Sequence, residues 1–309
     1  MLLSVAICAH NPRADYLART ITGLCAQTVP LSQWELLLID NASTTDTAAK
    51  ADLSAHPHAR VVPEPNIGLT AARRRAIAEA AGEILLFVDD DNVLSPDYLA
   101  HVLEISRTHP WLGAWGAGRI EPEFENLPAG WLPEYAVYLT LAADARDAWG
   151  NGYDYSYVPF GAGLCIRRPI ARRYAQILDE QPQRYSLDRK GTQLSSGGDT
   201  DMAWTACDLG LGVGRFVRLQ MLHLIPASRT TPEFLLRVTE SGNYSSVWLK
   251  HFRGLPQTID NPSLFQRLAR WRYERTLPAL ARQLRLVARR GHARALAEIS
   301  AAAGPVSPA

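Results

Sequence analysis

Residues 83–92 read EILLFVDDDN, an apolar run that ends in three aspartates and an asparagine. A short run of this kind is typical of a strand in a parallel sheet that helices bury on both faces. Three adjacent carboxylates repel one another, and folded proteins normally relieve such repulsion with a bound cation or by protonation. The acidic run 89–91 therefore predicts a divalent-cation site at a strand end, with a solvated acidic turn as the alternative.

The sequence on either side of this run alternates strands with helices. We expect strands over 2–8, 34–40, 60–64, 83–89, 158–168 and 215–226, and helices over 13–26, 68–81 and 199–209. This alternation predicts an α/β fold with a doubly wound, mostly parallel sheet and helices on both faces. Ligands bind to such sheets in the crevice at the carboxyl ends of the strands, so the residues that follow each strand are the candidates for a site.

Polar and small residues follow the first three strands. They are Ala9, His10 and Asn11 after the first strand, Asp40 after the second, and Asn66 and Gly68 after the third. Asp40 would reach the same crevice as the acidic run, where a carboxylate can accept hydrogen bonds from a nucleobase or a ribose; alone, it would be a turn-former. Gly68 lets the backbone approach a ligand at the start of a helix, and Arg73 on that helix can reach a phosphate or a base.

Two segments later in the chain add candidate side chains. In GGDTD, residues 197–201, Asp199 is placed as a helix N-cap, but a carboxylate on such a loop also suits a general base, and the two glycines let the loop order around a substrate. His223 follows an apolar strand, where an imidazole either packs in the core or completes a metal site. Arg229, six residues further on, can pair with phosphate.

The bulk composition excludes several classes of protein. The chain has 309 residues, 47% of them hydrophobic and 20% charged, which is typical of a globular protein. A net charge of +1 gives no electrostatic reason to bind nucleic acid. The sequence contains no apolar run long enough to span a membrane and no secretory signal pattern at its start, so we expect a cytoplasmic protein.

The composition and the periodicity of the sequence change twice along the chain. Residues 110–160 are rich in aromatic side chains, which either pack or contact sugar faces. Beyond about residue 230 the pattern is helical, and we expect two units, 1–229 and a helical, basic region 230–309. Between Ser263 and Arg294 nine arginines accompany one acid, Glu274. This segment either packs on the first unit with a solvated charged face, or docks peripherally onto an anionic surface such as the inner face of the cell membrane.

Taken in order, six of these segments resemble the family 2 glycosyltransferases, which have the GT-A fold. The quoted pieces are VAICAHN (5–11), LLLIDNAS (36–43), NIGLTAARR (66–74), the DxD-type FVDDDN (87–92), PFGAGLCIRR (159–168) and GGDTDM (197–202). The resemblance covers residues 3 to about 229. It implies an inverting enzyme that uses Mn²⁺ or Mg²⁺ to transfer a sugar from a nucleotide-sugar, with a UDP-sugar favoured, to a saccharide or glycolipid acceptor in polysaccharide, lipopolysaccharide or other glycoconjugate synthesis.

The resemblance also implies roles for single residues. It implies that Asp40 contacts the nucleobase, Asp90 contacts the ribose, and Asp91 and His223 bind the metal. Asp199 then removes the proton from the acceptor. The remaining donor-binding candidates are Ala9, His10, Asn11, Asn66, Gly68, Arg73, Gly161, Ala162 and Arg229. The family usually has Glu-Asp where this chain has Gly198-Asp199, which leaves Asp201 as the alternative base.

Two other functions fit parts of the sequence. A sugar-nucleotide nucleotidyltransferase would also place acids and a metal in an α/β crevice, but it needs a glycine- and lysine-rich phosphate loop near the N-terminus, and AICAHNP (6–12) is not one. A non-catalytic sugar- or membrane-binding protein on a degenerate transferase fold is the second alternative, and the basic C-terminal segment is the reason to consider it.

Overall fold

The computed structural model describes residues 1–47, 49, 51–126, 138–191, 193–257 and 262–302. The strands are β1 (Leu3–Ala9), β2 (Trp34–Asn41), β3 (Ala59–Glu64), β4 (Ile84–Val88), β5 (Asn92–Leu94), β6 (Leu112–Phe124), β7 (Ala142–Ala143), β8 (Ala148–Gly150), β9 (Leu164–Arg167) and β10 (Gly212–Ile225). The helices are α1 (Ala14–Cys25), α2 (Leu69–Glu79), α3 (Tyr98–Thr108), α4 (Arg168–Glu180), α5 (Gly198–Asp208), α6 (Pro232–His251), α7 (Leu264–Thr276) and α8 (Ala279–Ala302). Short 3-10 helices in the described residues include η1 (Leu31–Gln33), η4 (Pro182–Leu187) and η5 (Ala227–Thr230).

The strands of the described chain form one sheet, in the order β3-β2-β1-β4-β9-β6-β10-β5, with β7 beside β6 and β8 beside β10. The first four strands in this order run parallel, as do β6 and β10. β9 runs antiparallel to both of its neighbours, and β5 runs antiparallel to β10. The sheet is therefore parallel in its N-terminal half and mixed beyond it.

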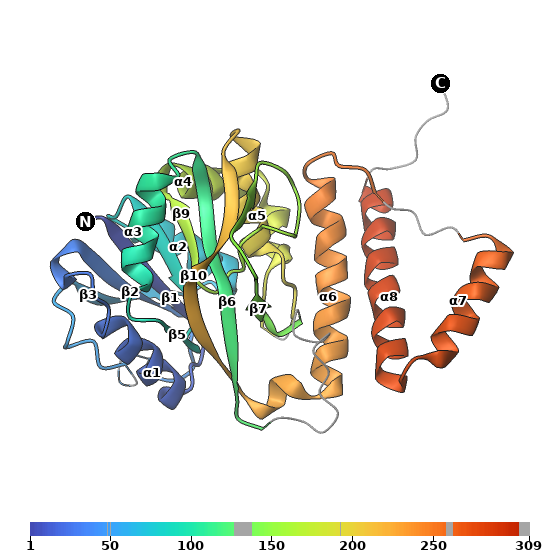
Figure 1. Cartoon of the computed structure of the whole chain (residues 1–309), viewed down its shortest axis with the longest axis horizontal. Helices are drawn as coiled ribbons and strands as arrows, with labels where there is room; N and C mark the ends of the chain where they lie inside the picture. Colours follow the sequence, from blue (N-terminus) through green and yellow to red (C-terminus); the bar gives the residue numbers. More distant parts are fainter. Residues whose placement is uncertain (48, 50, 127–137, 192, 258–261, 303–309) are drawn as a thin grey trace.

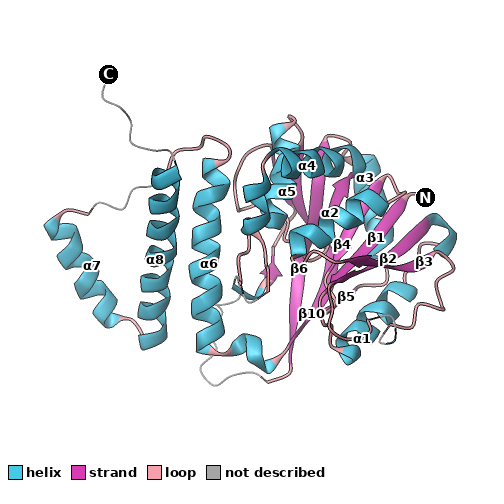
Figure 2. Cartoon of the chain, turned by 180° about the vertical axis from the view of Figure 1, so that it is seen from behind, coloured by secondary structure: helices cyan, strands magenta, loops and turns pink. Residues whose placement is uncertain are grey.

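Helices cover both faces of the sheet, which confirms the predicted α/β class. Apolar residues of α1 and α3 pack with one face, and those of α2, α4 and α5 pack with the other (Figures 1 and 2). Strands such as β4, in which all five residues are buried, explain why the sequence shows continuous apolar runs rather than alternation.

The central strand β6 lies in the segment 110–160, for which no strand was predicted. Its glycines explain the weak signal, because glycine is depleted in strands. They also explain the packing: a Cβ on Gly113 would lie 2.4 Å from the Cβ of Ala206, and one on Gly118 would lie 2.8 Å from the backbone of Phe216. The glycines let helix α5 and strand β10 approach β6 closely.

The aromatic side chains of this segment divide between packing and surface. Trp115 is fully buried in the core. Trp111 and Trp149 are about half exposed, and their ring centroids lie 6.0 Å apart. Trp131 and Tyr135, two further candidates for sugar contacts, lie outside the described residues.

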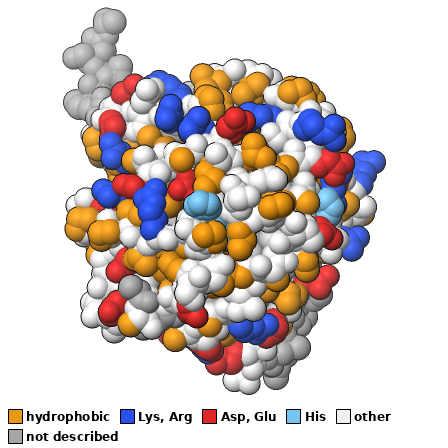
Figure 3. All heavy atoms as spheres, turned by 90° about the vertical axis from the view of Figure 1, so that its left-hand side faces the viewer, with side chains coloured by type: hydrophobic (Ala, Val, Ile, Leu, Met, Phe, Trp, Pro, Cys, Tyr) orange, Lys and Arg blue, Asp and Glu red, His pale blue; other side chains and the backbone are white. Residues whose placement is uncertain are grey.

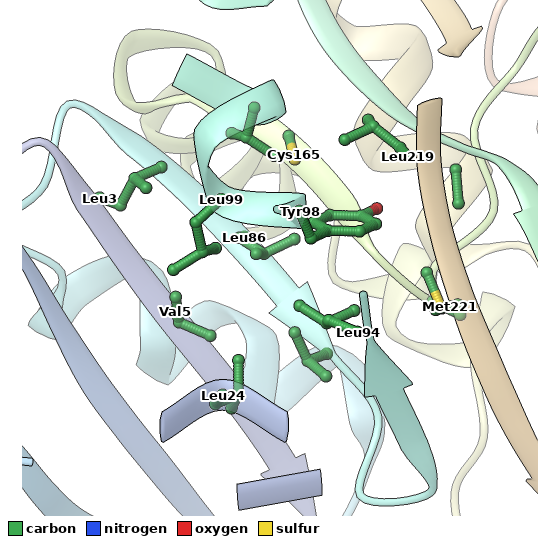
Figure 4. Close-up of a cluster of buried hydrophobic side chains, with 14 of the residues drawn as sticks. Leu3, Val5, Leu24, Leu86, Leu94, Tyr98, Leu99, Cys165, Leu219 and Met221 are labelled. Atoms are coloured by element: carbon green, nitrogen blue, oxygen red, sulfur yellow. The ribbon is translucent and has the colours of Figure 1, made fainter. Parts of the chain in front are cut away.

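Strand β9 is shorter than predicted, because the backbone turns at Gly161–Gly163 before the strand begins. Gly163 has a φ of +73°, and its carbonyl accepts a hydrogen bond of 2.9 Å from the buried Tyr98 hydroxyl. A Cβ on Gly163 would lie 2.3 Å from both that hydroxyl oxygen and the Met221 Cε. Figure 4 shows Tyr98 and Met221 converging on this part of the core.

The C-terminal region is helical, as predicted. α6 lies beside the α/β unit and α8 packs along α6, whereas α7 projects away from both (Figure 1). A Cβ on Gly291 would lie 2.1 Å from the Glu240 carbonyl oxygen, so this glycine sets the closest approach of α8 to α6. None of the described helices combines the length and the apolar character needed to cross a membrane.

Substitution of Gly163 tests the importance of the turn before β9. Gly163→Ala should lower the free energy of unfolding by about 1–2 kcal/mol for the left-handed backbone and by about 1–3 kcal/mol more for the clash with Tyr98. Gly210 is the matched control, because its φ is +78° and nothing lies within 4 Å of its added Cβ. Gly210→Ala should show only the backbone contribution in urea unfolding. Equal losses for the two variants would contradict the packing argument.

Candidate active site

A cleft opens at the carboxyl ends of β1 and β4, where the register pairs Ile7 with Val88. Ten of the residues predicted from the sequence line it: Ala9, His10, Gly68, Arg73, Asp90, Asp91, Gly161, Ala162, Asp199 and Arg229. These residues come from segments as far apart as residues 9 and 229, and the strand order brings them together. The predicted crevice is therefore present at the sheet edge where the fold class places it.

The acidic run forms a buried turn between β4 and β5. The Asn92 amide donates to Asp91 Oδ1 at 3.1 Å, and its carbonyl oxygen accepts from the Asp89 backbone amide at 3.3 Å. β5 pairs with β10 in a register that sets Asn92 opposite His223. The Leu224 amide also donates to the Asp91 carbonyl at 2.8 Å, so β10 holds the backbone of the turn in place.

Charge in this turn is concentrated on one carboxylate. Burial and the charges of Asp91 and Asp89 raise the pKa of Asp90 to about 7. Burial, followed by the charge of Asp91, also raises the pKa of Asp89. Burial opposes ionisation of Asp91 as well, but the Arg229 guanidinium and the His223 imidazole hold its pKa well below its usual range. Repulsion within the triplet is thus relieved by Arg229 and by the raised pKa values of two carboxyls.

Asp91, His223 and Arg229 form a contiguous group. Arg229 Nη1 lies 2.8 Å from Asp91 Oδ2, and His223 Nε2 lies 3.7 Å from the same oxygen. Arg229 Nη1 is also 3.3 Å from His223 Nε2. His223 Nδ1 is buried and has no hydrogen-bond partner among the described residues.

This group can supply two ligands to a divalent cation. Asp91 Oδ2 and His223 Nε2 lie 3.7 Å apart, and Arg229 Nη1 is within 3.3 Å of both. Mg²⁺ typically takes only one or two protein carboxylates, with phosphates and water completing its coordination. In the described part of the chain no three His, Cys, Asp or Glu side chains converge on one point. The residues therefore fit a cation that is shared with a phosphate-bearing ligand, rather than a site closed by protein ligands.

Asp199 lies at the start of α5, but it is not the N-cap that the sequence predicted. The helix begins at Gly198 with Gly197 in the capping position, so Asp199 is its second residue. Its Oδ1 accepts a hydrogen bond from the Thr200 amide and its Oδ2 accepts one from the Gly161 amide, both at 2.8 Å. Two backbone amides thus fix the carboxylate at the wall of the cleft.

The neighbourhood of Asp199 is packed through glycines. A Cβ on Gly161 would lie 2.6 Å from Arg73 Nη2 and 2.9 Å from Asp199 Oδ2. A Cβ on Gly198 would lie 2.4 Å from Asp188 Oδ2. The glycines of both motifs therefore allow charged groups to touch the backbone directly.

Arg73 lines the cleft, but its guanidinium already has a protein partner. Nη1 donates to Asp188 Oδ2 at 2.6 Å, and both side chains are buried. Burial would lower the pKa of Arg73, yet the charges of Asp188 and Asp199 outweigh it and raise the value. Arg73 therefore pairs with Asp188 and carries its positive charge near the Asp199 carboxylate.

Asp201, the alternative base, lies elsewhere. Its side chain is fully buried, and Oδ1 accepts from Arg184 Nη1 at 2.5 Å and from Arg253 Nη1 at 2.7 Å. It does not line the cleft.

Four predicted residues do not line the cleft. Asn11 bonds to Ser43 and Thr44, and Asn66 donates to Glu64. Asp40 accepts from the Thr47 hydroxyl at 3.0 Å and from the Ser43 amide at 3.3 Å, while its neighbour Asn41 lines the cleft instead. His223 is the fourth, although it lies behind Asp91, as described above.

The sequence reasoning missed Asn41, Asp188 and Arg189. Asn41 bonds to the Gly68 amide at 2.8 Å and so positions the start of α2. Arg189 lines the cleft, and burial together with the charge of Arg229 lowers its pKa. Its guanidinium makes no hydrogen bond or ion pair of ordinary length with the described residues. The signal for it was DRKG at 188–191, a charged segment separated by five residues from the acidic motif at 197–201.

Part of the chain is similar in sequence to known proteins. Residues 4–129 match the family described as Glycosyl transferase family 2. The putative teichuronic acid biosynthesis glycosyltransferase TuaG of Bacillus subtilis is 32% identical over 109 residues, which are 33% of this chain and 41% of TuaG. The succinoglycan biosynthesis protein ExoM of Rhizobium meliloti is 24% identical over 168 residues, 49% of each chain. The chain thus spans less than half the length of these curated relatives.

A solved structure has the same fold. The mannosyltransferase PcManGT from Pyrobaculum calidifontis, solved in complex with GDP-Man and Mn²⁺, matches with a TM-score of 0.58 and 17% identity over 99% of this chain and 76% of its own. At that identity the likeness shows the fold, which is the GT-A fold. The match over residues 4–129 and these relatives support a glycosyltransferase family 2 domain in that part of the chain.

Proposed function

We propose that this chain is a metal-dependent, inverting glycosyltransferase that moves a sugar from a nucleoside-diphosphate-sugar, a UDP-sugar in the first instance, to an acceptor hydroxyl. One observation carries the proposal: a single cleft holds both Asp91, which is paired with Arg229, and the Asp199 carboxylate. The first suits a diphosphate with its counter-ion, and the second suits proton removal. The names of TuaG and ExoM support a role in the synthesis of a polysaccharide or related glycoconjugate.

In this proposal Asp199 accepts the proton of the acceptor hydroxyl as that oxygen attacks the anomeric carbon. The Gly161 and Thr200 amides fix the carboxylate and leave its remaining lone pairs to face the cleft. The bond to the departing diphosphate breaks on the opposite side of the sugar, so a single displacement inverts the anomeric configuration. An α-linked donor then gives a β-linked product.

The diphosphate is proposed to lie against Asp91, Arg229 and Arg189. Asp91 and His223 would hold Mn²⁺ or Mg²⁺, which supplies positive charge to neutralise the leaving group. The Arg229 guanidinium, now paired with Asp91, and the Arg189 guanidinium would donate hydrogen bonds to phosphate oxygens. Asp90 is proposed to bind the ribose.

The nucleobase contact, the division of the chain and the class of acceptor are proposed from the resemblance to family 2 glycosyltransferases. Asp40 is proposed to contact the base, although Asn41 is the residue of that strand end that lines the cleft. Residues 1–229 are proposed as the donor-binding and catalytic unit, with 230–309 as the attached helical region. The acceptor is proposed to be a saccharide or a glycolipid.

Nucleotide binding provides the first test. UDP with Mn²⁺ should raise the melting temperature, because a ligand at a hundredfold its Kd stabilises the folded state by about 2.7 kcal/mol. Without Mn²⁺, or in a His223→Ala variant, the shift should shrink. A parallel series with GDP and other nucleoside diphosphates identifies the donor class. If no nucleotide shifts the melting temperature with metal present, the proposed donor site is wrong.

The role of Asp199 provides the second test. Asp199→Asn should lower the rate of sugar transfer, measured as formation of free UDP from the donor, by about 10²- to 10⁴-fold. The UDP-dependent shift in melting temperature should stay intact. Asp201→Asn is the matched control. It should destabilise the fold by about 3–5 kcal/mol, because Arg184 and Arg253 would lose their buried partner.

Loss of turnover in Asp201→Asn at full stability, with turnover retained in Asp199→Asn, would reassign the base. Binding of nucleotide without turnover in the wild-type protein would favour the non-catalytic alternative.

Arg189 provides the third test. Arg189→Gln should weaken UDP binding about tenfold or more, because a charge-assisted hydrogen bond to phosphate contributes about 1.5–3 kcal/mol. Lys190→Gln, the neighbouring exposed cation that does not line this cleft, should bind UDP like the wild type. The measurement is a titration of UDP with Mn²⁺ by calorimetry. Equal affinities for Arg189→Gln and the wild type would exclude Arg189 from the diphosphate site.

A further inference from the structure

Helix α7 is exposed along its whole length. It begins with a capping box, in which the Ser263 hydroxyl accepts from the Gln266 amide and the Gln266 side chain accepts from the Ser263 amide. None of its residues is buried. In Figure 1 the helix projects from the end of the molecule, beyond α8. A helix of this length has marginal stability in water by itself, and most helices are stabilised by packing of one face. We therefore expect a face of α7 to bind another surface.

One face of α7 carries four exposed apolar side chains, with Arg272 and Arg275 among them. Leu264 is 81% exposed, Phe265 87%, Leu268 54% and Trp271 51%. At about 100° of rotation per residue these four side chains fall within an arc of about 120°. We call these four residues the α7 apolar face.

The α7 apolar face points away from α8. The contacts between the two helices come from the other side of α7, where Glu274 pairs with Arg289 at 2.6 Å and the Tyr273 ring lies 5.2 Å from the Arg285 guanidinium. At about 100° per residue, Tyr273 projects opposite to Leu264, and Glu274 lies about 120° from Leu268, at the edge of the apolar arc nearer to Trp271. Among the described residues, none covers the α7 apolar face.

Cations accompany this face. Arg267, Arg272 and Arg275 are exposed on α7, and the Arg275 guanidinium lies 4.1 Å from the centre of the Trp271 ring. Arginines beside tryptophan, phenylalanine and leucine are typical of a helix that lies in the interface of an anionic bilayer. The opposite end of the molecule is different: Figure 3 shows basic, acidic and apolar side chains interspersed over that face.

We propose that α7 docks the protein on an anionic lipid membrane, with the α7 apolar face in the boundary between headgroups and acyl chains and its arginines against lipid phosphates. Charge decides between this occupant and a second copy of the chain. In a symmetric pair the same patch faces itself, so Arg272 and Arg275, which lie on the apolar arc, would meet like charges. Anionic headgroups accept both the apolar side chains and the arginines. This proposal does not depend on the proposed catalytic function.

The test is co-sedimentation of the full chain with vesicles. The wild type should bind vesicles of phosphatidylglycerol and phosphatidylcholine in equal parts, bind phosphatidylcholine vesicles poorly, and lose affinity as salt is raised. A Phe265→Ser/Trp271→Ser variant should bind at least about tenfold more weakly. An Arg267→Gln/Arg272→Gln variant should bind about thirtyfold more weakly to the anionic vesicles.

Matched controls separate this surface from general effects. Leu209→Ser removes an apolar side chain that is 50% exposed at the end of α5, and Arg107→Gln/Arg172→Gln removes two exposed arginines from α3 and α4. Both controls should bind vesicles like the wild type, and every variant should keep the wild-type melting temperature.

Two results would overturn the proposal. The first is equal vesicle binding by the wild type and the Phe265→Ser/Trp271→Ser variant. The second is a wild-type dimer in light scattering that this variant dissolves, with no binding of the wild type to anionic vesicles.

Discussion

The ion pair between Arg229 and Asp91 connects the two halves of the sheet. At 2.8 Å it places a cation from the turn after β10 on the acidic turn after β4. The backbone supports the pair, because β5 runs antiparallel to β10 and the Leu224 amide bonds to the Asp91 carbonyl. Without this partner Asp91 would be a buried carboxylate with no guanidinium beside it, and the cost of burying its charge next to Asp89 and Asp90 would oppose folding. Arg229 therefore stabilises the acidic turn and also lines the proposed donor site.

Close backbone approach is the second constraint. The carboxylate of Asp199 and the guanidinium of Arg73 reach the cleft only because Gly161 has no side chain, and Asp188 has room only because Gly198 has none. The sequence suggested that the glycines before Asp199 serve to make a loop adaptable. The contacts give them a different role, which is to let charged groups pack against main chain. A rigid carboxylate suits proton transfer better than a mobile one.

The sequence predicted the strand ends well, because runs such as ILLFV mark buried strands and end at the polar residues that follow. It was less accurate where one residue of register matters. Strand β2 continues to Asn41, and neighbouring side chains of a strand point to opposite faces, so Asn41 and not Asp40 lines the cleft. Likewise α5 begins at Gly198, which removes Asp199 from the capping position. The positions of Arg189 and β6 could not be predicted, because they depend on contacts between distant segments, such as Ala206 with Gly113. No local sequence pattern encodes such contacts.

The buried carboxylate of Asp201 limits how the chain can be divided. Its two cationic partners come from different parts of the sequence: Arg184 lies before α5, and Arg253 lies just beyond α6. Arg253 also reaches Asp208 at the other end of α5. A change in sequence style near residue 230 suggests a modular joint, but the helix that carries the proposed base is held by an arginine from beyond that joint. A shortened protein that ends after η5 would keep every residue of the cleft named above and still lose one of the two charges that neutralise the core beneath it. The turn after α6 therefore helps to stabilise α5, and α6 with this turn has to be transferred or redesigned together with α5.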